Sequence, residues 1–191
     1  MRRLFSVSMT GLSGLGSLTG LAAVSFAAPA VAAEINVKVE IPRLSVAEYH
    51  RPYVAMWLER ADQSPVATLA VWYDVKLKNA EGTKWLKDMR QWWRKAGRDL
   101  QMPADGISGA TRAPGEHTVT FTEGKAPLAK LPAGEYQLVV EAAREVGGRE
   151  LLRVPFTWPP EAAKSGAKSA AISAQAKGQH ELGAVTVSLK P

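Results

Sequence analysis

Apolar and polar residues alternate in short runs along most of this chain, a pattern typical of β-strands that bury one face. The first run, residues 34–41, places four branched aliphatic side chains on one face: Ile35, Val37, Val39 and Ile41. Clusters of Gly, Pro, Asp and Ser separate the runs and indicate turns. Alternation and turn signals, with aromatic and β-branched residues as the basis for 53–60 and 66–77, predict seven strands. They cover residues 34–41, 53–60, 66–77, 117–122, 135–141, 150–158 and 182–189.

Many short strands with turn signals between them favour an all-β fold. We expect an immunoglobulin-like two-sheet β-sandwich of about seven strands with one Trp-rich α-helix, and a small open barrel is the alternative. An α/β sheet is disfavoured, because the chain lacks the helical segments that crossovers between parallel strands require.

One segment has a different period. Thr83 is a candidate N-cap and Gly97 a candidate C-terminal stop, so we expect an α-helix over residues 84–96. Its apolar residues fall within about a third of the helix circumference: Trp85, Leu86, Met89, Trp92, Trp93 and Ala96. This face is expected to pack on a sheet, and a stacking wall for a planar ligand is the alternative.

The N-terminus has the composition of a secretory signal peptide. Arg2 and Arg3 precede an apolar stretch, and Ala32 and Ala33 provide small residues for cleavage before Glu34. A membrane anchor is the alternative, but several glycines and serines dilute the hydrophobicity. We expect residues 1–33 to be a signal peptide and residues 34–191 to form one exported β-sandwich domain that is not embedded in a membrane. Within that domain, the Ala/Ser/Lys-rich stretch 161–179 is expected to be a flexible loop.

Charge and composition remove several classes of function. Loss of Arg2 and Arg3 lowers the formal net charge from +6 to +4. No basic cluster with interleaved aromatic residues points to nucleic-acid binding. The chain contains no cysteine, which excludes disulfides, thiolate metal sites and iron–sulfur clusters. Any redox chemistry would therefore need an organic cofactor or a group borrowed from another molecule.

The histidines and hydroxyl residues give little sign of catalysis. His50, His117 and His180 are far apart and lack metal-ligand spacing, so structural roles are expected. Ser108 does not lie in a Gly-x-Ser-x-Gly elbow, and no partner base is evident, so a hydrolase is disfavoured. We predict no catalytic and no metal-binding residues.

A short motif remains between the predicted helix and the strand after it. Residues 105–111 read Asp-Gly-Ile-Ser-Gly-Ala-Thr. A tight turn would account for Asp105, Gly106 and Gly109, but not for the hydroxyls at positions 108 and 111. The pattern Asp-x-x-(Ser/Thr)-Gly-Ala-(Ser/Thr) arises by chance on the order of once in several hundred chains of this length.

This motif resembles the flavinylation motif recognised by FAD:protein FMN transferases, exported enzymes that modify subunits of sodium-pumping NADH:quinone reductases. The resemblance implies that FMN is joined through its phosphate to the hydroxyl of Thr111, with Asp105, Ser108, Gly109 and Ala110 as the surrounding pattern. The wider chain is similar to a family of uncharacterised periplasmic domains, often encoded beside PepSY-type membrane proteins and flavin transferases. That similarity rests on several further features: the signal peptide, the Trp-Leu-x-x-Met-x-x-Trp-Trp segment, Ser-Gly-Ala-Thr-Arg-x-Pro-Gly and a terminal Glu-Leu-Gly-Ala-Val-Thr.

Simple chemistry adds expectations about the site. An acceptor hydroxyl has to enter another enzyme's active site, so we expect Thr111 to lie on an exposed, flexible loop of small residues. Arg112 is expected to offset the charge of the attached phosphodiester. Trp92 or Trp93 is expected to stack on the flavin ring.

We therefore expect a periplasmic flavoprotein that carries covalent FMN and transfers electrons between a membrane reductase and an extracytoplasmic acceptor. The family resemblance implies an FMN transferase and a PepSY-type membrane protein as partners, and reduction of iron or another metal as the setting. Such a protein is a redox carrier and the substrate of the transferase rather than an enzyme. The alternative is a cofactor-free binding or structural module.

Overall fold

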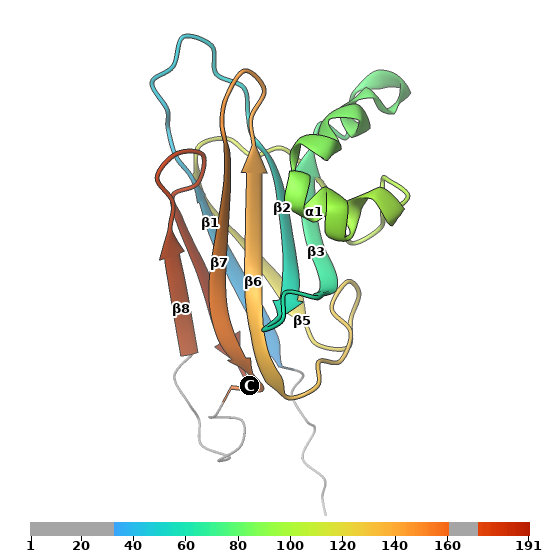
Figure 1. Cartoon of the computed structure of the whole chain (residues 1–191), viewed down its shortest axis with the longest axis vertical. Coiled ribbons are helices and arrows are strands. Elements are labelled where there is room, and N and C mark those ends of the chain that lie inside the picture. The colour runs from blue at the N-terminus through green and yellow to red at the C-terminus, as the bar shows by residue number, and fades with distance from the viewer. Residues whose placement is uncertain (1–32, 161–171) are drawn as a thin grey trace, which may run out of the picture. The chain divides into compact units, whose positions relative to one another are not determined.

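Two β-sheets face each other in the computed structural model, which describes residues 33–160 and 172–191 (Figure 1). The signal peptide predicted up to residue 33 lies outside the described residues, apart from Ala33 itself. The first sheet has the strand order β5-β1-β9-β8. Its strands are β1 (Glu34–Ile41), β5 (Gly115–Thr122), β8 (Ile172–Lys177) and β9 (Ala184–Lys190).

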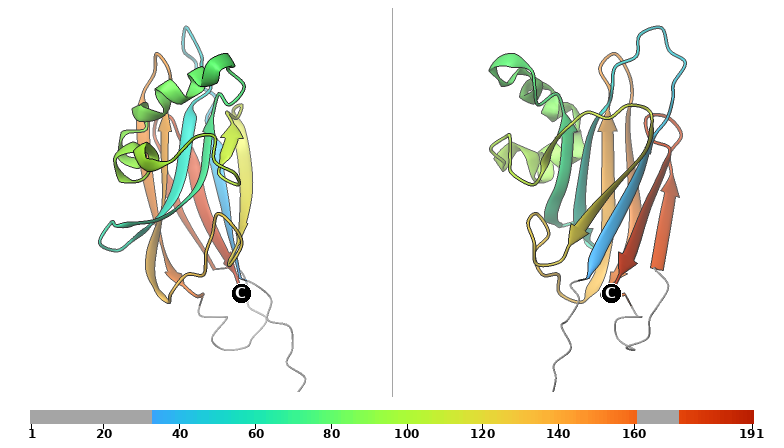
Figure 2. Two further views of the ribbon diagram at one scale, coloured as in Figure 1. Left: turned by 90° about the vertical axis from the view of Figure 1, so that its right-hand side faces the viewer. Right: turned by 180° about the vertical axis from the view of Figure 1, so that it is seen from behind.

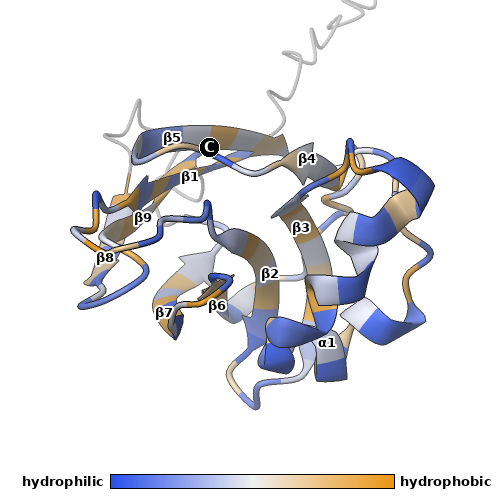
Figure 3. Ribbon diagram, turned by 90° about the horizontal axis from the view of Figure 1, so that it is seen from above, coloured by the Kyte–Doolittle hydropathy of each residue, from blue (hydrophilic) through white to orange (hydrophobic). Residues whose placement is uncertain are grey.

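The second sheet has five strands in the order β4-β3-β2-β6-β7. All its pairings are antiparallel except the one between β3 and the short β4. Its strands are β2 (Tyr53–Arg60), β3 (Pro65–Tyr73), β4 (Ser108–Ala110), β6 (Gly134–Ala143) and β7 (Arg149–Trp158). Figure 3 looks along the gap between the layers, with β5, β1, β9 and β8 on one side and the second sheet on the other.

The main core fills the space between the sheets. In β1, every second residue is buried, and these are the aliphatic residues predicted from the alternation. They meet the inner face of the second sheet, including Trp72, Tyr136 and Leu138. The two-sheet β-sandwich predicted from the sequence is therefore confirmed, with nine strands among the described residues in place of about seven.

A second apolar cluster covers the outer face of the five-stranded sheet. Strand β2 is buried on both faces, because the helical segments pack over its outer side, away from β1 (Figure 2 and Figure 3). Leu86, Met89 and Trp92 from those segments contact Trp57 and other outer-face residues of β2, β3 and β6. The expected packing of the Trp-rich segment on a sheet is confirmed for Trp92, which is fully buried.

The single α-helix predicted over residues 84–96 is wrong in form. The segment consists of η1 (Lys78–Asp88), which is a 3₁₀-helical stretch with a kink, then α1 (Arg90–Lys95) and η2 (Gly97–Asp99). Met89 has a non-helical ψ of 74° and separates η1 from α1. The side chain of Thr83 does not cap a helix, because its hydroxyl donates to the carbonyl of Ala80 within η1.

Two strands of the structure, β4 and β8, were not predicted from the sequence. The stretch 161–179 was expected to be a loop, but Ile172–Lys177 forms β8, which pairs with β9; residues 161–171 lie outside the described residues. The motif at 105–111 was expected to be a flexible loop, but Ser108–Ala110 forms β4. The predicted strand 66–77 ends earlier, at Tyr73. In the two described stretches of chain, none of the helices has the length and apolarity needed to cross a membrane.

Candidate functional site

Thr111 follows β4 at the edge of the five-stranded sheet. Strand β4 pairs in parallel with the end of β3, and the Thr111 N–H continues this pairing by donating to the carbonyl of Tyr73 at 3.2 Å. The Thr111 side chain is partly exposed, and its hydroxyl donates to Asp74 Oδ1 at 3.2 Å. The hydroxyl predicted to carry a flavin is therefore held in place at the end of a strand.

Two glycines explain how the motif folds locally. Gly106 has a φ of 72°, which favours glycine, and it lies in the turn that leads into β4. At Gly109 an added Cβ would lie 3.1 Å from Cδ1 of Trp72. This contact is tighter than most side chains tolerate, so the absence of a side chain at position 109 lets β4 pack closely against β3.

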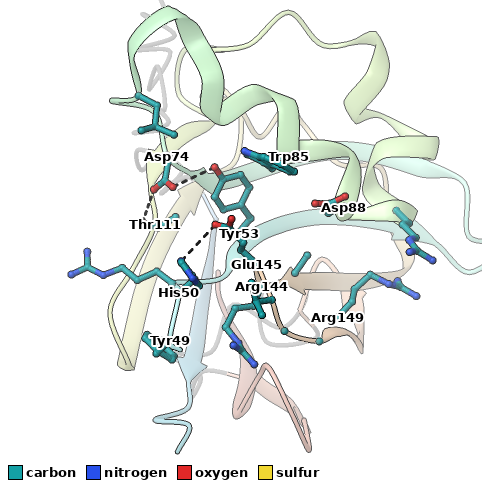
Figure 4. A pocket seen from close by; sticks show the side chains of 17 residues that line it. Tyr49, His50, Tyr53, Asp74, Trp85, Asp88, Thr111, Arg144, Glu145 and Arg149 are labelled. Atoms are coloured by element: carbon teal, nitrogen blue, oxygen red, sulfur yellow. Dashed lines mark hydrogen bonds and ion pairs between the residues drawn. The ribbon is translucent and has the colours of Figure 1, made fainter. Parts of the chain in front are cut away.

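Asp74 connects Thr111 to the neighbouring strand β2. The Tyr53 hydroxyl donates to Asp74 Oδ2 at 3.4 Å, while Oδ1 accepts from Thr111 (Figure 4). Burial, together with the nearby Asp74 carboxylate, raises the pKa of Tyr53 to about 12. Tyr53 is therefore protonated at neutral pH and acts as a donor, which leaves Asp74 as the acceptor for both hydroxyls.

The Thr111 side chain lines a pocket of about 780 Å³. The pocket lies between the end of β3, the helical segment η1, the segment before β2 and the loop between β6 and β7. Figure 4 shows Trp85, Asp88 and Arg149 on one side of it and Thr111, His50 and Tyr49 on the other. Its volume lies within the range of about 300–1,000 Å³ that is typical of cofactor and small-molecule sites.

The other predicted site residues do not reach this pocket. Asp105 and Ala110 are exposed, and the Ser108 hydroxyl accepts the N–H of Ala104 at 2.9 Å within the turn. The Arg112 guanidinium lies over the Trp72 ring, 5.2 Å from its centroid. Of the six residues predicted to form the cofactor site, only Thr111 lines the pocket.

The expected stacking role is wrong for Trp92, and Trp93 does not line this pocket. Trp92 is fully buried, with its indole N–H directed to the Thr68 hydroxyl, and Trp93 packs against Trp92 away from the pocket lining. Trp85 lines the pocket instead and is 48% exposed. Adjacent positions of a 3₁₀-helix point about 120° apart, so Trp85 of η1 faces away from the buried Leu86 beside it.

Positive charge predominates among the polar side chains of the pocket. Four arginines line it (Arg51, Arg90, Arg144 and Arg149), together with the carboxylates of Asp74, Asp88 and Glu145. Two of these arginines are paired with buried glutamates, Arg144 with Glu181 and Arg149 with Glu141. His50 also lines the pocket, 2.8 Å from a Glu48 oxygen and 3.6 Å from a Glu145 oxygen.

Buried carboxylates of the sheet hold α1 over its outer face. Glu141 of β6 accepts the backbone N–H groups of Gln91 and Trp92, with its closest contact at 2.8 Å. Glu59 of β2 lies 2.7 Å from the Lys95 ammonium group at the other end of α1. Both glutamate side chains are fully buried. This clamp fixes the helical segment that presents Trp85 and Arg90 to the pocket.

Sequence reasoning located Thr111 but missed the residues around it. Asp74 and Tyr53 are distant in sequence from residues 105–111 and belong to no motif. Tyr49, Arg144 and Trp85 come from three different segments. Only the parallel pairing of β4 with β3, which three residues of sequence cannot reveal, brings Thr111 to Asp74.

Comparison with known families identifies the chain. Residues 34–184 match the model of the family described as "Predicted periplasmic protein (DUF2271)", and the chain belongs to this family. The description agrees with the expected periplasmic location, while the signal peptide and its cleavage stay predictions. Comparisons with curated proteins and with solved structures find no match.

Proposed function

We propose that this member of the periplasmic DUF2271 family is a flavoprotein with FMN joined by a phosphoester to Thr111, and that it carries electrons between a membrane reductase and an extracytoplasmic acceptor. FMN accepts and releases one or two electrons, so a tethered FMN supplies the redox chemistry that a chain without cysteine or metal-binding motifs lacks. In this role the protein is a carrier and the substrate of an FMN transferase.

The observation that carries the proposal is the position of the Thr111 hydroxyl. It is the last residue of a motif of the flavinylation type, it is partly exposed, and it lines a pocket large enough for a cofactor. A buried hydroxyl would have argued against the proposal. A turn whose only role was to connect η2 to β5 would need neither the hydroxyl nor the pocket.

Asp74 suits the chemistry of attachment. In the transfer, the Thr111 oxygen forms a bond to the FMN phosphorus of FAD, the pyrophosphate bond breaks, AMP leaves and the hydroxyl loses its proton. The carboxylate of Asp74 already accepts that proton in a hydrogen bond, at 3.2 Å. It therefore orients the oxygen and can take up the proton as the new bond forms.

The residues around the pocket fit a bound flavin. Trp85 offers a partly exposed indole on which a flat, apolar ring system can stack. A phosphodiester at Thr111 keeps a negative charge of the same sign as Asp74, so the attached group requires nearby positive charge. Arg51 and Arg90 line the same pocket and supply it. They replace Arg112 in the role expected from the sequence.

The partners follow from this function. An exported FAD:protein FMN transferase loads the protein, and a PepSY-type membrane protein exchanges electrons with it. Reduction of ferric iron or another metal outside the cytoplasm is the setting that we propose. Covalent attachment keeps the flavin with the carrier in a compartment without a dependable free flavin pool.

Co-expression with an FMN transferase tests the proposal. Denatured protein should keep flavin fluorescence and gain the mass of one FMN less water, because a covalent bond survives unfolding. Thr111→Ala should abolish the signal, and Thr111→Ser should retain it. Thr118→Ala, at an exposed threonine of β5, is the matched control and should load like the wild type. Flavin that is released by denaturant, or that persists in Thr111→Ala, would contradict the proposal.

A cofactor-free binding module is the second candidate, because the pocket could also hold a ligand that is never covalently attached. It predicts no flavin after denaturation even when the transferase is active on a known substrate. The same experiment therefore separates the two candidates.

A further inference from the structure

Two residues that line the pocket each carry a buried hydrogen-bond donor atom with no partner among the described residues. These atoms are the hydroxyl of Tyr49 and the Nη1 atom of Arg144. Figure 4 shows them apart from Asp74 and Thr111, with His50 and Glu145 between the two groups. Proteins rarely leave buried donors unpaired, because each such donor loses its hydrogen bonds to water without replacement.

The orientation of Arg144 is fixed by one neighbour. Its Nε and Nη2 donate to the two carboxylate oxygens of Glu181 at 2.8 and 3.1 Å. Glu181 is held in turn by the N–H of Gly148 at 2.8 Å. The two side chains are only 6% and 4% exposed. A bidentate pair uses one edge of the planar guanidinium, which leaves Nη1 free to bind something else.

The charge around Tyr49 favours a negative acceptor. The charged groups with the largest effect on its hydroxyl are the guanidinium groups of Arg144, Arg51 and Arg43 and the carboxylate of Glu181. Burial is the main reason that the pKa of the Tyr49 hydroxyl is raised, so at neutral pH the group is a donor. Two donors in a net positive environment suit an oxygen or nitrogen acceptor that carries negative charge.

We infer that Tyr49 Oη and Arg144 Nη1 form a subsite for an electron-rich acceptor edge, and that this edge is the N1 and C2-carbonyl side of the flavin ring. The inference rests on the proposed function and extends it. Two-electron reduction of the ring with uptake of one proton, by electrons from the membrane reductase, leaves a negative charge on that edge. A guanidinium and a phenol hydroxyl placed there favour the reduced form over the neutral oxidised form, and so raise the reduction potential.

Tyr49→Phe is the decisive variant, because it removes one oxygen that has no partner within the described chain. The unloaded variant should therefore be as stable as the wild type. In the loaded protein, loss of a hydrogen bond to a charged acceptor should weaken the preference for the reduced ring about tenfold. For a two-electron couple, this lowers the midpoint potential by about 30 mV. Spectroelectrochemical titration of the flavinylated protein measures the shift.

Tyr136→Phe is the matched control. Its hydroxyl donates to the carbonyl of Pro132 at 2.7 Å, far from the pocket lining. This variant should lose stability and keep the wild-type potential, the opposite of Tyr49→Phe. Equal potentials for the wild type and Tyr49→Phe would overturn the subsite.

A second arm separates this inference from the attachment itself. Thr111→Ala protein, which cannot be loaded at Thr111, is titrated with riboflavin and followed by flavin fluorescence. We expect binding that weakens about tenfold when Tyr49→Phe is added. Tyr49-dependent riboflavin binding without covalent flavin on the wild type would overturn the attachment and keep the subsite. Absence of any Tyr49 dependence in both arms would overturn the subsite whatever happens at Thr111.

Discussion

Glu141→Gln should destabilise the protein because it weakens the clamp that holds α1 on the sheet. The Glu141 carboxylate is fully buried and accepts the N–H groups of Gln91 and Trp92 and a guanidinium N–H of Arg149 at 2.8 Å. A glutamine side chain has the same shape and keeps one oxygen that accepts from the backbone donors. Its N–H₂ group then faces the Arg149 guanidinium, which is also a donor. Hydrogen bonds to an ionised group are about twice as strong as neutral ones.

The magnitude follows from these contacts. Two bonds to backbone donors each weaken by about 1 kcal/mol, and loss of the bond to the partly exposed Arg149 removes about 1 kcal/mol more. We expect a loss of about 3 kcal/mol in the free energy of unfolding. With a urea m-value of about 2 kcal/mol/M, the denaturation midpoint should fall by about 1.5 M.

The assay is urea denaturation followed by tryptophan fluorescence, since Trp92 is buried under the same clamp. Glu135→Gln on the same strand is the control, because Glu135 accepts only an exposed hydrogen bond from Thr157 and should change stability by less than about 0.5 kcal/mol. The reasoning would be refuted if Glu141→Gln and Glu135→Gln had the same midpoint.

Three further predictions concern the pocket. Asp74→Asn should slow flavin loading at least about tenfold in a time course of in-gel fluorescence, because an amide cannot take up the Thr111 proton; an unchanged rate would show that the transferase alone provides the base. Trp85→Leu should increase the fluorescence of the attached flavin by removing a stacking partner, whereas Trp93→Leu should not; equal yields in the two variants would remove Trp85 from the site. Burial, with the Asp74 carboxylate, raises the pKa of Tyr53 from 10.0 to about 12. The difference in tyrosinate absorbance between the wild type and Tyr53→Phe, which reports Tyr53 alone, should therefore titrate near pH 12. The stability that un-ionised Tyr53 contributes is thus fully present below pH 10 and is lost as the pH rises through 12, and a titration near pH 10 would contradict this environment.

Alternation of apolar residues was enough to predict most of the sandwich. The bounds of β1 are predicted to the residue, because a strand with one buried face alternates every second residue. Strand β2 is buried on both faces, and its bounds come instead from aromatic and β-branched residues that run up to a turn signal. Strand β8 was missed because its small and polar residues form an exposed edge, where pairing with β9 rather than burial decides the structure. Strand β4 has only three residues and therefore no period to detect.

The helical segment shows where a periodic pattern misleads. The spacing of the apolar residues in this segment fits an α-helix with 3.6 residues per turn. However, Leu86, Met89 and Trp92 also follow one another at intervals of three residues. The structure has 3₁₀ geometry in η1, non-helical Met89 after it and only a short α-helix in α1, and Trp85 lines the pocket. The spacing of the apolar residues does not distinguish this arrangement from one continuous α-helix.

The candidate site was predictable only where a motif marks it. Thr111 stands at the end of a recognisable pattern, whereas Asp74, Tyr49 and Arg144 join the pocket through sheet pairing and hairpin geometry. The placement of Arg112 shows the limit of reasoning from neighbours in sequence. In an extended strand successive side chains point to opposite faces, so a residue next to Thr111 need not face the same pocket.

Peptide mapping of the protein after co-expression with an FMN transferase tests the central claim most directly. Trypsin cleavage after Arg98 and Arg112 releases a peptide whose only hydroxyl side chains are Ser108 and Thr111. We predict that this peptide carries one FMN and that fragment masses place the phosphoester on Thr111. An unmodified peptide from cells in which the transferase flavinylates a known substrate, or an FMN located on Ser108, would contradict the account.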